Sequence, residues 1–356
     1  MSPTGQARAT LRDVAERAGV SVSTASLVFS GKGPVADTTA ERVREAARAV
    51  GFTGPNPLAS SLRQGRAGAV GVLVEGRLRV AFRDPFAISV LDGIAEVLDT
   101  IPSGMLLIGQ QTGHPDAIVP QLAGLALDAV VFSLCGPEGN PAVDHLAARG
   151  IPMFGTSVPD DPRVTHVRID ERAAGAAISR YVHDLGHRRV ATVTMPMSPT
   201  SVAGPVSAAE LRDACYVASK GRLEGFREVF GDEAPALQTG DGSSVEGGLV
   251  AGRILLDVDP LDRPTAIVAQ SDVIAAGVIR AAEDLGLRVP DDLSVTGFDG
   301  VDLPWLAHRL TTMDQQGHEK GRLLGELVRR TLDGEQPGPV TQPVALRVGT
   351  TTARAR

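Results

Sequence analysis

Cysteine is scarce in this sequence. The chain has two among 356 residues, Cys135 and Cys215, and they stand 80 positions apart. Two cysteines so far apart support neither a framework of disulfide bonds nor a structural zinc site. We therefore expect a fold that does without covalent cross-links, as cytoplasmic proteins do.

Long apolar runs are also missing. The longest, such as Ala129–Leu134, are far shorter than the about 20 residues that a membrane span requires. The first ten residues contain no apolar core of the kind that signal peptides carry. We expect a cytoplasmic protein with no membrane partner.

The motifs of common enzyme chemistry are incomplete. Gly155–Pro159 lacks the last glycine of a nucleophile elbow, and residues 318–322 contain one of the two histidines of a zinc-protease helix. No glycine run is followed by a phosphate-loop lysine. His183 and His187 have the spacing of metal ligands, but they straddle a predicted helix end. The sequence therefore predicts no enzyme activity, no metal site and no cofactor.

The overall composition is that of a globular protein. Apolar residues make up 43% of the chain and charged residues 22%, which is enough apolar surface for a sizeable core. At about 150 residues per domain, a chain of 356 residues predicts two or three compact units.

The charge is unevenly distributed. The first 66 residues carry nine basic and five acidic side chains, a net charge of +4, whereas the remainder carries 26 and 37, a net charge of −11. Such asymmetry is typical of a nucleic-acid-binding segment attached to an acidic protein. Chance clustering of solvated charges is the alternative that charge alone leaves open.

Three short helices are predicted in the first 50 residues. Apolar residues recur at helical spacing in the segments 11–18, 22–29 and 43–50. Gly19 and Val20 interrupt the first pattern, and Ser21 is placed to cap the second helix. This predicts a helix, a tight turn and a helix.

A third helix and a linker follow. Asp37 or Thr38 can cap the third helix, and Gly51 ends it. Residues 53–57 contain two prolines that break any helix, and the amphipathic stretch 58–63 is too short to be stable alone in water. We interpret this region as a linker that becomes ordered when it docks.

The pattern changes at Ala69, where strand-length apolar runs begin to alternate with helical segments. This alternation is typical of a parallel sheet covered on both faces. The predicted strands are Ala69–Val74, Met105–Gly109, Ala129–Leu134, Pro152–Phe154, His166–Ile169, Val190–Thr194, Ala266–Ala269 and Leu293–Gly297. Helices between them include Ile88–Leu98, Ala173–Leu185, Val245–Leu256 and Val273–Leu285. The alternation restarts after about residue 165, which predicts two similar α/β lobes, and residues 196–218 are predicted to form a long loop or insertion.

The first two helices have the features of a DNA-binding helix-turn-helix. That motif needs a small residue in the turn and a polar start to the second helix, whose side chains reach phosphates and base edges in the major groove. Residues 18–26 supply both.

Seven segments, spread over nearly the whole chain, carry a family resemblance: Leu11–Ser21, Thr24–Ser26, Pro55–Leu62, His183–Arg189, Arg222–Phe226, Ser294–Asp299 and Leu310–Thr312. In kind and in order they resemble motifs of the lactose-repressor (LacI/GalR) family of bacterial transcription factors. The resemblance implies an all-α helix-turn-helix DNA-binding domain followed by an α/β two-lobed core like that of type I periplasmic binding proteins. The implied domains are 1–54 for DNA binding, 55–67 for a hinge helix and linker, and 68–356 for effector binding and dimerisation. The first lobe would comprise about 68–165 and 316–340, and the second about 166–315 and 341–352.

The resemblance also implies a homodimer that reads an inverted repeat in double-stranded DNA, with a tetramer left open. Each hinge helix would enter the central minor groove, where Leu62 would wedge between base pairs and kink the duplex. A core leucine of a linker helix is the alternative. Lys32 and Arg63 would either contact phosphates or remain solvated.

The recognition helix departs from the family at one position. Val22 and Ser23 would touch base edges, but Leu27 stands where many members carry arginine, and leucine cannot make the bidentate contact with guanine. The operator sequence therefore cannot be carried over from other members. The implied DNA-binding residues are Ser21, Val22, Ser23, Thr24, Ser26, Leu27, Lys32, Asn56, Leu58, Ala59, Leu62 and Arg63.

An effector would bind between the lobes. Ligands of open α/β sheets sit beyond the carboxyl ends of strands, and both Asp272 and Asp299 follow predicted strands. Arginine and carboxylate groups can hydrogen-bond pairs of sugar hydroxyls, and an aromatic ring can form an apolar wall. The resemblance implies effector positions at Arg222, Ser271, Asp272, Asp299 and Gln315. Phe86 completes the predicted effector set as an apolar or stacking wall from the first lobe. Asp272 is equally well explained as the N-cap of the following helix. Ser271 stands where asparagine is commoner, and the segment before Arg222 is longer than usual, which leaves the identity of the effector open.

We therefore expect a ligand-responsive DNA-binding transcriptional repressor whose operator affinity is controlled by a small molecule, a carbohydrate, in the cleft between the lobes. The resemblance implies structural roles for His183 and His187. Two alternatives from other classes are a cytosolic sugar-binding protein without a regulatory role and an α/β sugar-metabolising enzyme. Both predict no operator-specific DNA binding.

Overall fold

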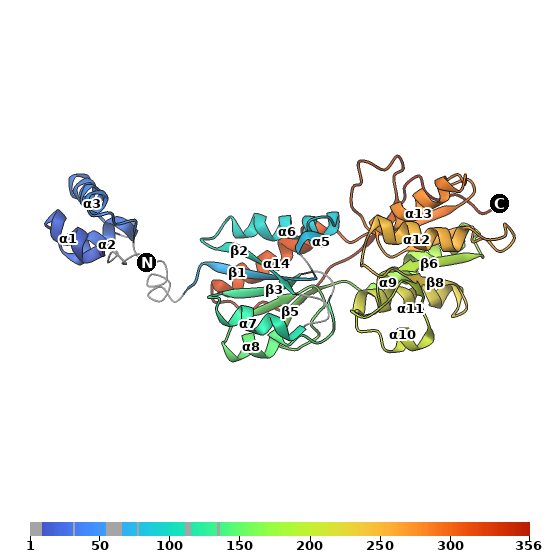
Figure 1. Ribbon diagram of the computed structural model, residues 1–356, viewed down its shortest axis with the longest axis horizontal. Helices are drawn as coiled ribbons and strands as arrows, with labels where there is room; N and C mark the ends of the chain where they lie inside the picture. The colour runs from blue at the N-terminus through green and yellow to red at the C-terminus, as the bar shows by residue number, and fades with distance from the viewer. Residues whose placement is uncertain (1–8, 31–32, 55–65, 77, 111–114, 134–135) are drawn as a thin grey trace, which may run out of the picture. The chain divides into compact units, whose positions relative to one another are not determined.

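The fold is taken from a computed structural model. The structure describes residues 9–30, 33–54, 66–76, 78–110, 115–133 and 136–356. The chain divides into two compact units, Met1–Ala67 and Gly68–Arg356 (Figure 1). In the described part of the chain, no helix combines the length and the apolar character needed to cross a membrane.

The described part of the first unit is helical. Its helices are α1 (Leu11–Ala18), α2 (Val22–Ser30) and α3 (Asp37–Val50). They enclose a small core of aliphatic residues: Val14, Ala15, Ala18, Ala25, Val43, Ala46 and Ala47. The rings of Phe29 and Phe52 pack edge to face with their centroids 5.3 Å apart, which closes one side of this core.

The predicted turn between α1 and α2 is confirmed. Gly19 adopts φ 63°, a left-handed conformation that ends α1 at no steric cost to a residue without a Cβ. The Ser21 hydroxyl accepts a hydrogen bond of 3.0 Å from the main-chain nitrogen of Thr24, as an N-cap residue does. For α3, the prediction that Asp37 or Thr38 is the cap was wrong. The N-cap is Ala36, and Asp37 is the first helical residue, where its negative charge interacts favourably with the helix dipole.

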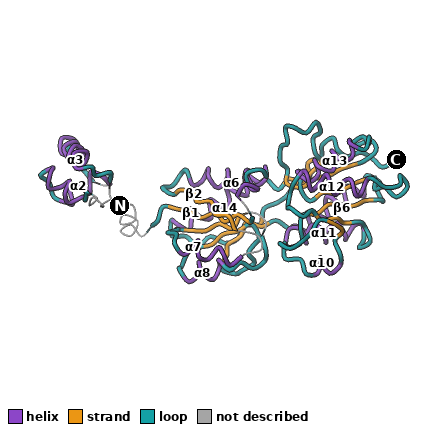
Figure 2. The backbone as a smooth tube through the Cα atoms, in the orientation of Figure 1, coloured by secondary structure: helices purple, strands orange, loops and turns teal. Residues whose placement is uncertain are grey.

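The second unit contains two sheets, each covered by helices on both faces (Figures 1 and 2). The first sheet has the order β12-β5-β4-β3-β1-β2, and all of its neighbours are parallel. Its strands are β1 (Ala69–Glu75), β2 (Gly104–Gln110), β3 (Ala129–Ser133), β4 (Met153–Gly155), β5 (Val164–Arg168) and β12 (Val340–Thr341). The helices around it are α5 (Leu78–Ala81), α6 (Pro85–Leu98), α7 (Ile118–Ala123) with the short 3-10 turn η1 (Pro115–Ala117), α8 (Ala142–Ala148) and α14 (Gly317–Leu332). We call this sheet and these helices the first lobe.

The second sheet has the order β13-β11-β10-β9-β6-β8-β7 and is parallel except at its two edges. Its strands are β6 (Val190–Thr194), β7 (Gly204–Pro205), β8 (Ala236–Gln238), β9 (Ala266–Ala269), β10 (Ser294–Asp299), β11 (Thr311–Asp314) and β13 (Ala345–Arg347). Helices α9 (Glu171–Asp184), α10 (Ala208–Arg212), α11 (Val217–Phe230), α12 (Val245–Leu256) and α13 (Asp272–Asp284) complete the second lobe.

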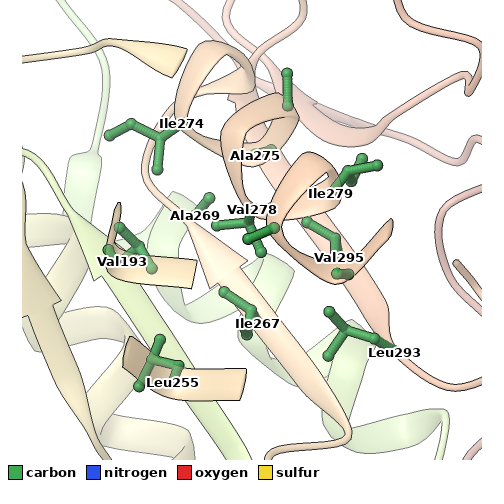
Figure 3. Packing of buried hydrophobic residues seen from close by; sticks show 14 of the residues in the cluster. Val193, Leu255, Ile267, Ala269, Ile274, Ala275, Val278, Ile279, Leu293 and Val295 are labelled. Carbon is green, nitrogen blue, oxygen red and sulfur yellow. The ribbon is translucent and has the colours of Figure 1, made fainter. Parts of the chain in front are cut away.

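Each lobe buries apolar side chains on both faces of its sheet. In the second lobe, α12 and α13 pack on one face, where Val193, Ile267 and Val295 of the strands meet Leu255 and Val278 of the helices (Figure 3). A separate cluster on the other face joins the sheet to α9 and α11. Strands buried on both faces explain why the sequence shows continuous apolar runs rather than alternation.

Three helix pairs pack at close range through glycine. In α6, a Cβ added to Gly93 would lie 2.0 Å from the carbonyl oxygen of His318 in α14. Gly225 allows the same close approach of α11 to α9, and Gly277 allows that of α13 to α12. The α6–α14 pair brings segments more than 200 residues apart in sequence side by side (Figure 1).

The tertiary structure corrects two predictions. The strand predicted at His166–Ile169 is β5, and it pairs with β4 and β12 in the first sheet rather than opening the second lobe. The segment 196–218, predicted as a long loop or insertion, is not a plain loop, because it contains β7 and α10 and reaches the start of α11. Strands β7, β8, β11, β12 and β13 were not predicted; each has two to four residues, too few for a pattern to be recognised.

Candidate ligand site and DNA-binding face

The two sheets share one topology, and it marks where a ligand can bind. The order β2-β1-β3-β4-β5 in the first sheet is repeated as β8-β6-β9-β10-β11 in the second. In open α/β sheets the binding crevice lies beyond the carboxyl ends of the strands, where the strand order reverses. These reversals fall between β1 and β3 and between β6 and β9.

A cavity of about 420 Å³ lies at these strand ends. Glu75 ends β1 and Met195 follows β6, and both line it. Its volume lies within the range of small-molecule sites, about 300–1,000 Å³. Both lobes contribute polar and aromatic side chains to its wall, namely Glu75, Asp84, Phe86, Lys320, Glu171, Tyr216, Arg222, Asp241, Asp299 and Gln315.

Arg222 is the buried cation of the second lobe. It lies on α11, and its side chain is 5% exposed. Its Nε donates to Oε2 of Glu171 over 2.7 Å, and its Nη1 donates to the main-chain oxygen of Gln270 over 2.7 Å. The guanidinium carbon lies 3.6 Å from the centre of the Phe298 ring, a cation–π contact. These contacts hold the guanidinium plane in one orientation beside the cavity.

Asp299 ends β10 with an unusual backbone. Its φ of 114° is a conformation that glycine tolerates and other residues rarely adopt, and such residues cluster at functional sites. Its Oδ1 accepts a hydrogen bond of 2.7 Å from Nε2 of Gln315 and lies 3.9 Å from Nη1 of Arg222. Burial raises the pKa of the Asp299 carboxyl well above its usual value; the Arg222 charge opposes this rise, and the acids Asp272 and Asp84 add to it.

Gln315 connects the acid to a buried lysine of the first lobe. Its Oε1 accepts from Nζ of Lys320 over 2.5 Å, and this Nζ lies 5.5 Å from the centre of the Phe86 ring. Asp84 caps α6 by accepting from the main-chain nitrogen of Phe86 over 2.9 Å, and burial raises the pKa of the Asp84 carboxyl. The chain of contacts from Lys320 through Gln315 to Asp299 therefore joins α14 to the second sheet at the cavity wall.

Four residues of the predicted effector set line the cavity: Phe86, Arg222, Asp299 and Gln315. Ser271 and Asp272 are not among its lining residues. The Ser271 hydroxyl accepts from the main-chain nitrogen of Ile274 over 3.1 Å, so Ser271, and not Asp272, is the N-cap of α13. Ser271 still reaches the site indirectly, because its hydroxyl lies 2.6 Å from that of Ser243, which lines the cavity.

Asp272 is the first residue of α13 and is fully buried. Its Oδ2 accepts a hydrogen bond of 2.8 Å from the main-chain nitrogen of Val301. Burial raises the pKa of Asp272 to about 7, since the hydrogen bonds that favour the charged form do not offset the lost hydration. Its contacts make it a support for the loop after β10.

Six further charged or aromatic residues of the wall were not predicted: Glu75, Asp84, Glu171, Tyr216, Asp241 and Lys320. Glu171 opens α9 directly after the crossover from β5, a position similar to that of Asp272, and this similarity is the signal that could have identified it. Lys320 reads in sequence as one cation of an amphipathic helix, and Tyr216 lies in the segment predicted as a loop. Neither has a sequence signal that points to a site.

The two histidines of the His183–Arg189 segment lie apart from this cavity. His187 is buried, and its ring nitrogens hydrogen-bond the Thr265 hydroxyl at 2.9 Å and the main-chain oxygen of Ala353 at 3.0 Å. His183 is in the last turn of α9 with a side chain 41% exposed. Within the ranges that the structure describes, no group of three or more side chains could hold a metal ion.

The start of α2 presents the predicted recognition residues. Ser21, Val22, Ser23 and Leu27 are exposed, whereas Ala25 of the same helix is buried in the core. Thr24 and Ser26 are half-buried. The other predicted DNA contacts lie outside the described residues: Lys32, Asn56, Leu58, Ala59, Leu62 and Arg63.

Comparisons with known proteins agree with both halves of this architecture. Residues 10–56 match the family described as bacterial regulatory proteins, lacI family, and residues 179–352 match a periplasmic binding protein-like domain. The HTH-type transcriptional regulator Rv3575c of Mycobacterium tuberculosis is 32% identical over 337 residues, which cover 92% of each chain. The HTH-type transcriptional repressor CytR of Escherichia coli is 27% identical over 93% of this chain and 92% of its own. A solved structure of the transcriptional regulator CelR in complex with cellobiose superimposes with a TM-score of 0.66 at 26% identity, covering 97% of this chain and all of the other.

Proposed function

This chain belongs to the LacI family of bacterial regulatory proteins and is a transcriptional regulator, and from that premise we propose that it represses transcription as a homodimer on an inverted-repeat operator. A carbohydrate in the cavity would control its affinity for the operator. Residues 1–54 would bind DNA, 55–67 would form the hinge, and 68–356 would bind the effector and dimerise.

The observation that carries the DNA-binding part is the capped turn of the first unit. Gly19 and Ser21 set the start of α2 so that Val22 and Ser23 are exposed at its N-terminus. Residues at this position of a recognition helix contact base edges in the major groove. The local net charge of +4 favours the approach to phosphates. The relative CytR is a transcriptional repressor by name, which supports repression rather than activation.

The effector part rests on the cavity at the strand ends. Arg222 and Asp299 offer a fixed donor plane and an acceptor, which suits vicinal hydroxyl groups, and the relative CelR is known in complex with a sugar, cellobiose. Because side chains of both lobes line the cavity, a ligand would favour one arrangement of the lobes. Coupling of this kind between two sites typically amounts to about 1–3 kcal/mol.

A gel-shift titration of the full chain tests the DNA-binding part. We expect DNA from upstream of the chain's own gene to bind more tightly than random DNA of equal length. The logarithm of the association constant, plotted against the logarithm of the salt concentration, should fall with a slope of about 0.9 for each phosphate contacted. A truncated chain that starts at Arg66 is the control and should not bind. Operator binding by this control would refute the proposal, and no specific binding by the full chain would favour a sugar-binding protein or an enzyme.

Leu62 carries a separate part of the proposal. It matches the family leucine that wedges between base pairs, and only the bent, specific complex can use such a wedge. We expect Leu62→Ala to weaken binding to the operator much more than binding to random DNA. Equal losses on both would make Leu62 a core leucine of the linker instead.

A further inference from the structure

The cavity wall carries more acid than base. Among its described lining residues, two side chains are cationic, Arg222 and Lys320, and five are acidic: Glu75, Asp84, Glu171, Asp241 and Asp299. Arg222 already pairs with Glu171 at 2.7 Å. Four acids remain beside one further described cation, so an anionic ligand group would meet few cations and several carboxyl groups whose pKa values its charge would raise further.

Glu75 differs from the other acids in its surroundings. It ends β1 at the reversal point of the first sheet, and its Oε1 accepts a hydrogen bond of 3.3 Å from the hydroxyl of Tyr216 in the second lobe. Within the described residues it forms no ion pair. Burial raises the pKa of the Glu75 carboxyl, and the Tyr216 hydroxyl lowers it less. A cation beside Glu75 would remove the cost of holding this charge in the cavity.

A second, smaller cavity of about 20 Å³ adjoins the first at Glu75. Gly136 and Val158 also line both spaces, and the polar residues Gln110 and Asn140 line the smaller one. Oε1 of Gln110 accepts from Nδ2 of Asn140 over 2.7 Å. A space of this size and polarity holds one water molecule or one small polar group.

We propose that the ligand of the large cavity is a polyhydroxylated amine, such as an amino sugar, and that Glu75 binds its ammonium group. The inference rests on the ligand site of the proposed function. Glu75 has acceptor positions beyond the one that Tyr216 uses, because an ionised carboxylate offers about four. The adjoining space takes the ammonium group or the water that solvates it. Hydroxyl groups of the ligand meet Arg222 and Asp299, and phosphorylated or carboxylated carbohydrates are excluded by the acidic wall.

Calorimetric titration of the full chain tests this assignment. The probes are three matched sets built on glucose, galactose and mannose, each with the neutral sugar, its 2-amino form, its N-acetylated form and its 6-phosphate. At least one amino sugar should bind about tenfold or more tightly than its neutral and N-acetylated counterparts, as expected for a charge-assisted hydrogen bond. The 6-phosphates should not bind.

Variants locate the preference at Glu75. Glu75→Gln should lose the preference for the amine while keeping the melting temperature of the unliganded protein. Glu138→Gln is the matched control, because Glu138 is an exposed carboxylate on the loop after β3 and does not line the cavity. Tyr216→Phe removes the competing hydroxyl and should keep the preference.

Three results would overturn the inference: no amino sugar of the three sets binds, a 6-phosphate binds as tightly as its neutral parent, or Glu75→Gln keeps the full preference. Gel shifts on the same samples distinguish failure of this inference from failure of the proposed function. If a neutral sugar changes operator affinity, the proposed function is supported and only the assignment of an amine to the ligand is rejected. Failure of the wild-type chain to bind its operator would count against the proposed function itself.

Discussion

Arg222 and Asp299 face each other across 3.9 Å at the cavity wall, but each makes its shorter hydrogen bonds elsewhere. Arg222 donates to Glu171 and to the main chain at Gln270, and Asp299 accepts from Gln315. The two charges are thus oriented by different elements, α9 and β9 on one side and the end of β11 on the other. A ligand hydroxyl can bridge them without first breaking a tight ion pair.

Arg222→Ala should abolish the ligand response and also destabilise the fold. It leaves the side chains of Glu171 and Asp299, 10% and 8% exposed, without their buried cation. Removing one partner of a buried pair costs about 3–5 kcal/mol of unfolding free energy. Urea denaturation measures this loss, and calorimetry measures ligand affinity.

Arg172→Ala is the control for that variant. Arg172 lies on α9 and pairs with Glu228, but its side chain is 60% exposed, so its removal should change stability little. If Arg222→Ala were no more destabilising than Arg172→Ala, the buried network would not contribute as described.

Asp272→Asn should alter how stability depends on pH. Burial raises the pKa of Asp272 from 3.8 to about 7, so the folded state binds this proton more tightly than the unfolded state does. The stabilisation from this proton is complete below about pH 3.8 and is lost as the pH rises to about 7. Asparagine has no such proton to lose and can still accept from the main chain at Val301. Relative to the variant, the wild type should lose stability across this window, by at most about 1.4 kcal/mol per unit of pKa shift. Urea denaturation at about pH 5 and about pH 8 measures the difference, and parallel pH profiles would contradict it.

Gly93→Ala should destabilise the first lobe by about 1–3 kcal/mol or more, because the added methyl group would collide with the main chain of α14. Its Cβ would lie 2.0 Å from the oxygen of His318 and 2.7 Å from the nitrogen of Arg322. Gly124→Ala is the control, since Gly124 has a negative φ and nothing within 4 Å of its added Cβ. Thermal unfolding that ranks the two variants equally would show that α6 and α14 can separate at little cost.

Ser21→Ala should weaken α2 by about 1 kcal/mol through loss of the cap. The Thr24 nitrogen would lose the hydroxyl that accepts its hydrogen bond. Ser21→Asp restores an acceptor and should recover the stability of the helix, although its charge should still weaken DNA binding. Hydrogen exchange at the Thr24 amide distinguishes these effects. Exchange that stays at the wild-type rate in Ser21→Ala would mean that Ser21 does not act as the cap.

The sequence predicted the elements of the fold well where local pattern decides them. Gly19 and Ser21 mark the turn between α1 and α2, and the apolar run at Ala69–Val74 marks β1. The assignment of β5 to a lobe failed because strand pairing is a long-range choice. Its partners β4 and β12 lie up to about 170 residues away, and no local pattern records them.

The candidate ligand site was likewise predictable in part. Arg222, Asp299 and Gln315 were identified from the family resemblance, and Phe86 from its aromatic side chain in the first lobe. Ser271 and Asp272 do not line the cavity because of the way in which α13 is capped and packed. Glu171, Tyr216 and Lys320 do line it because the chain passes back and forth between the two lobes and so brings these residues together. Sequence alone determined the residue types, the strand-end positions and the helix-turn-helix, because these follow from local periodicity, capping and turn chemistry. Only the tertiary structure decided which polar groups converge, because Glu75 and Tyr216 are 141 positions apart and meet solely through the packing of two sheets.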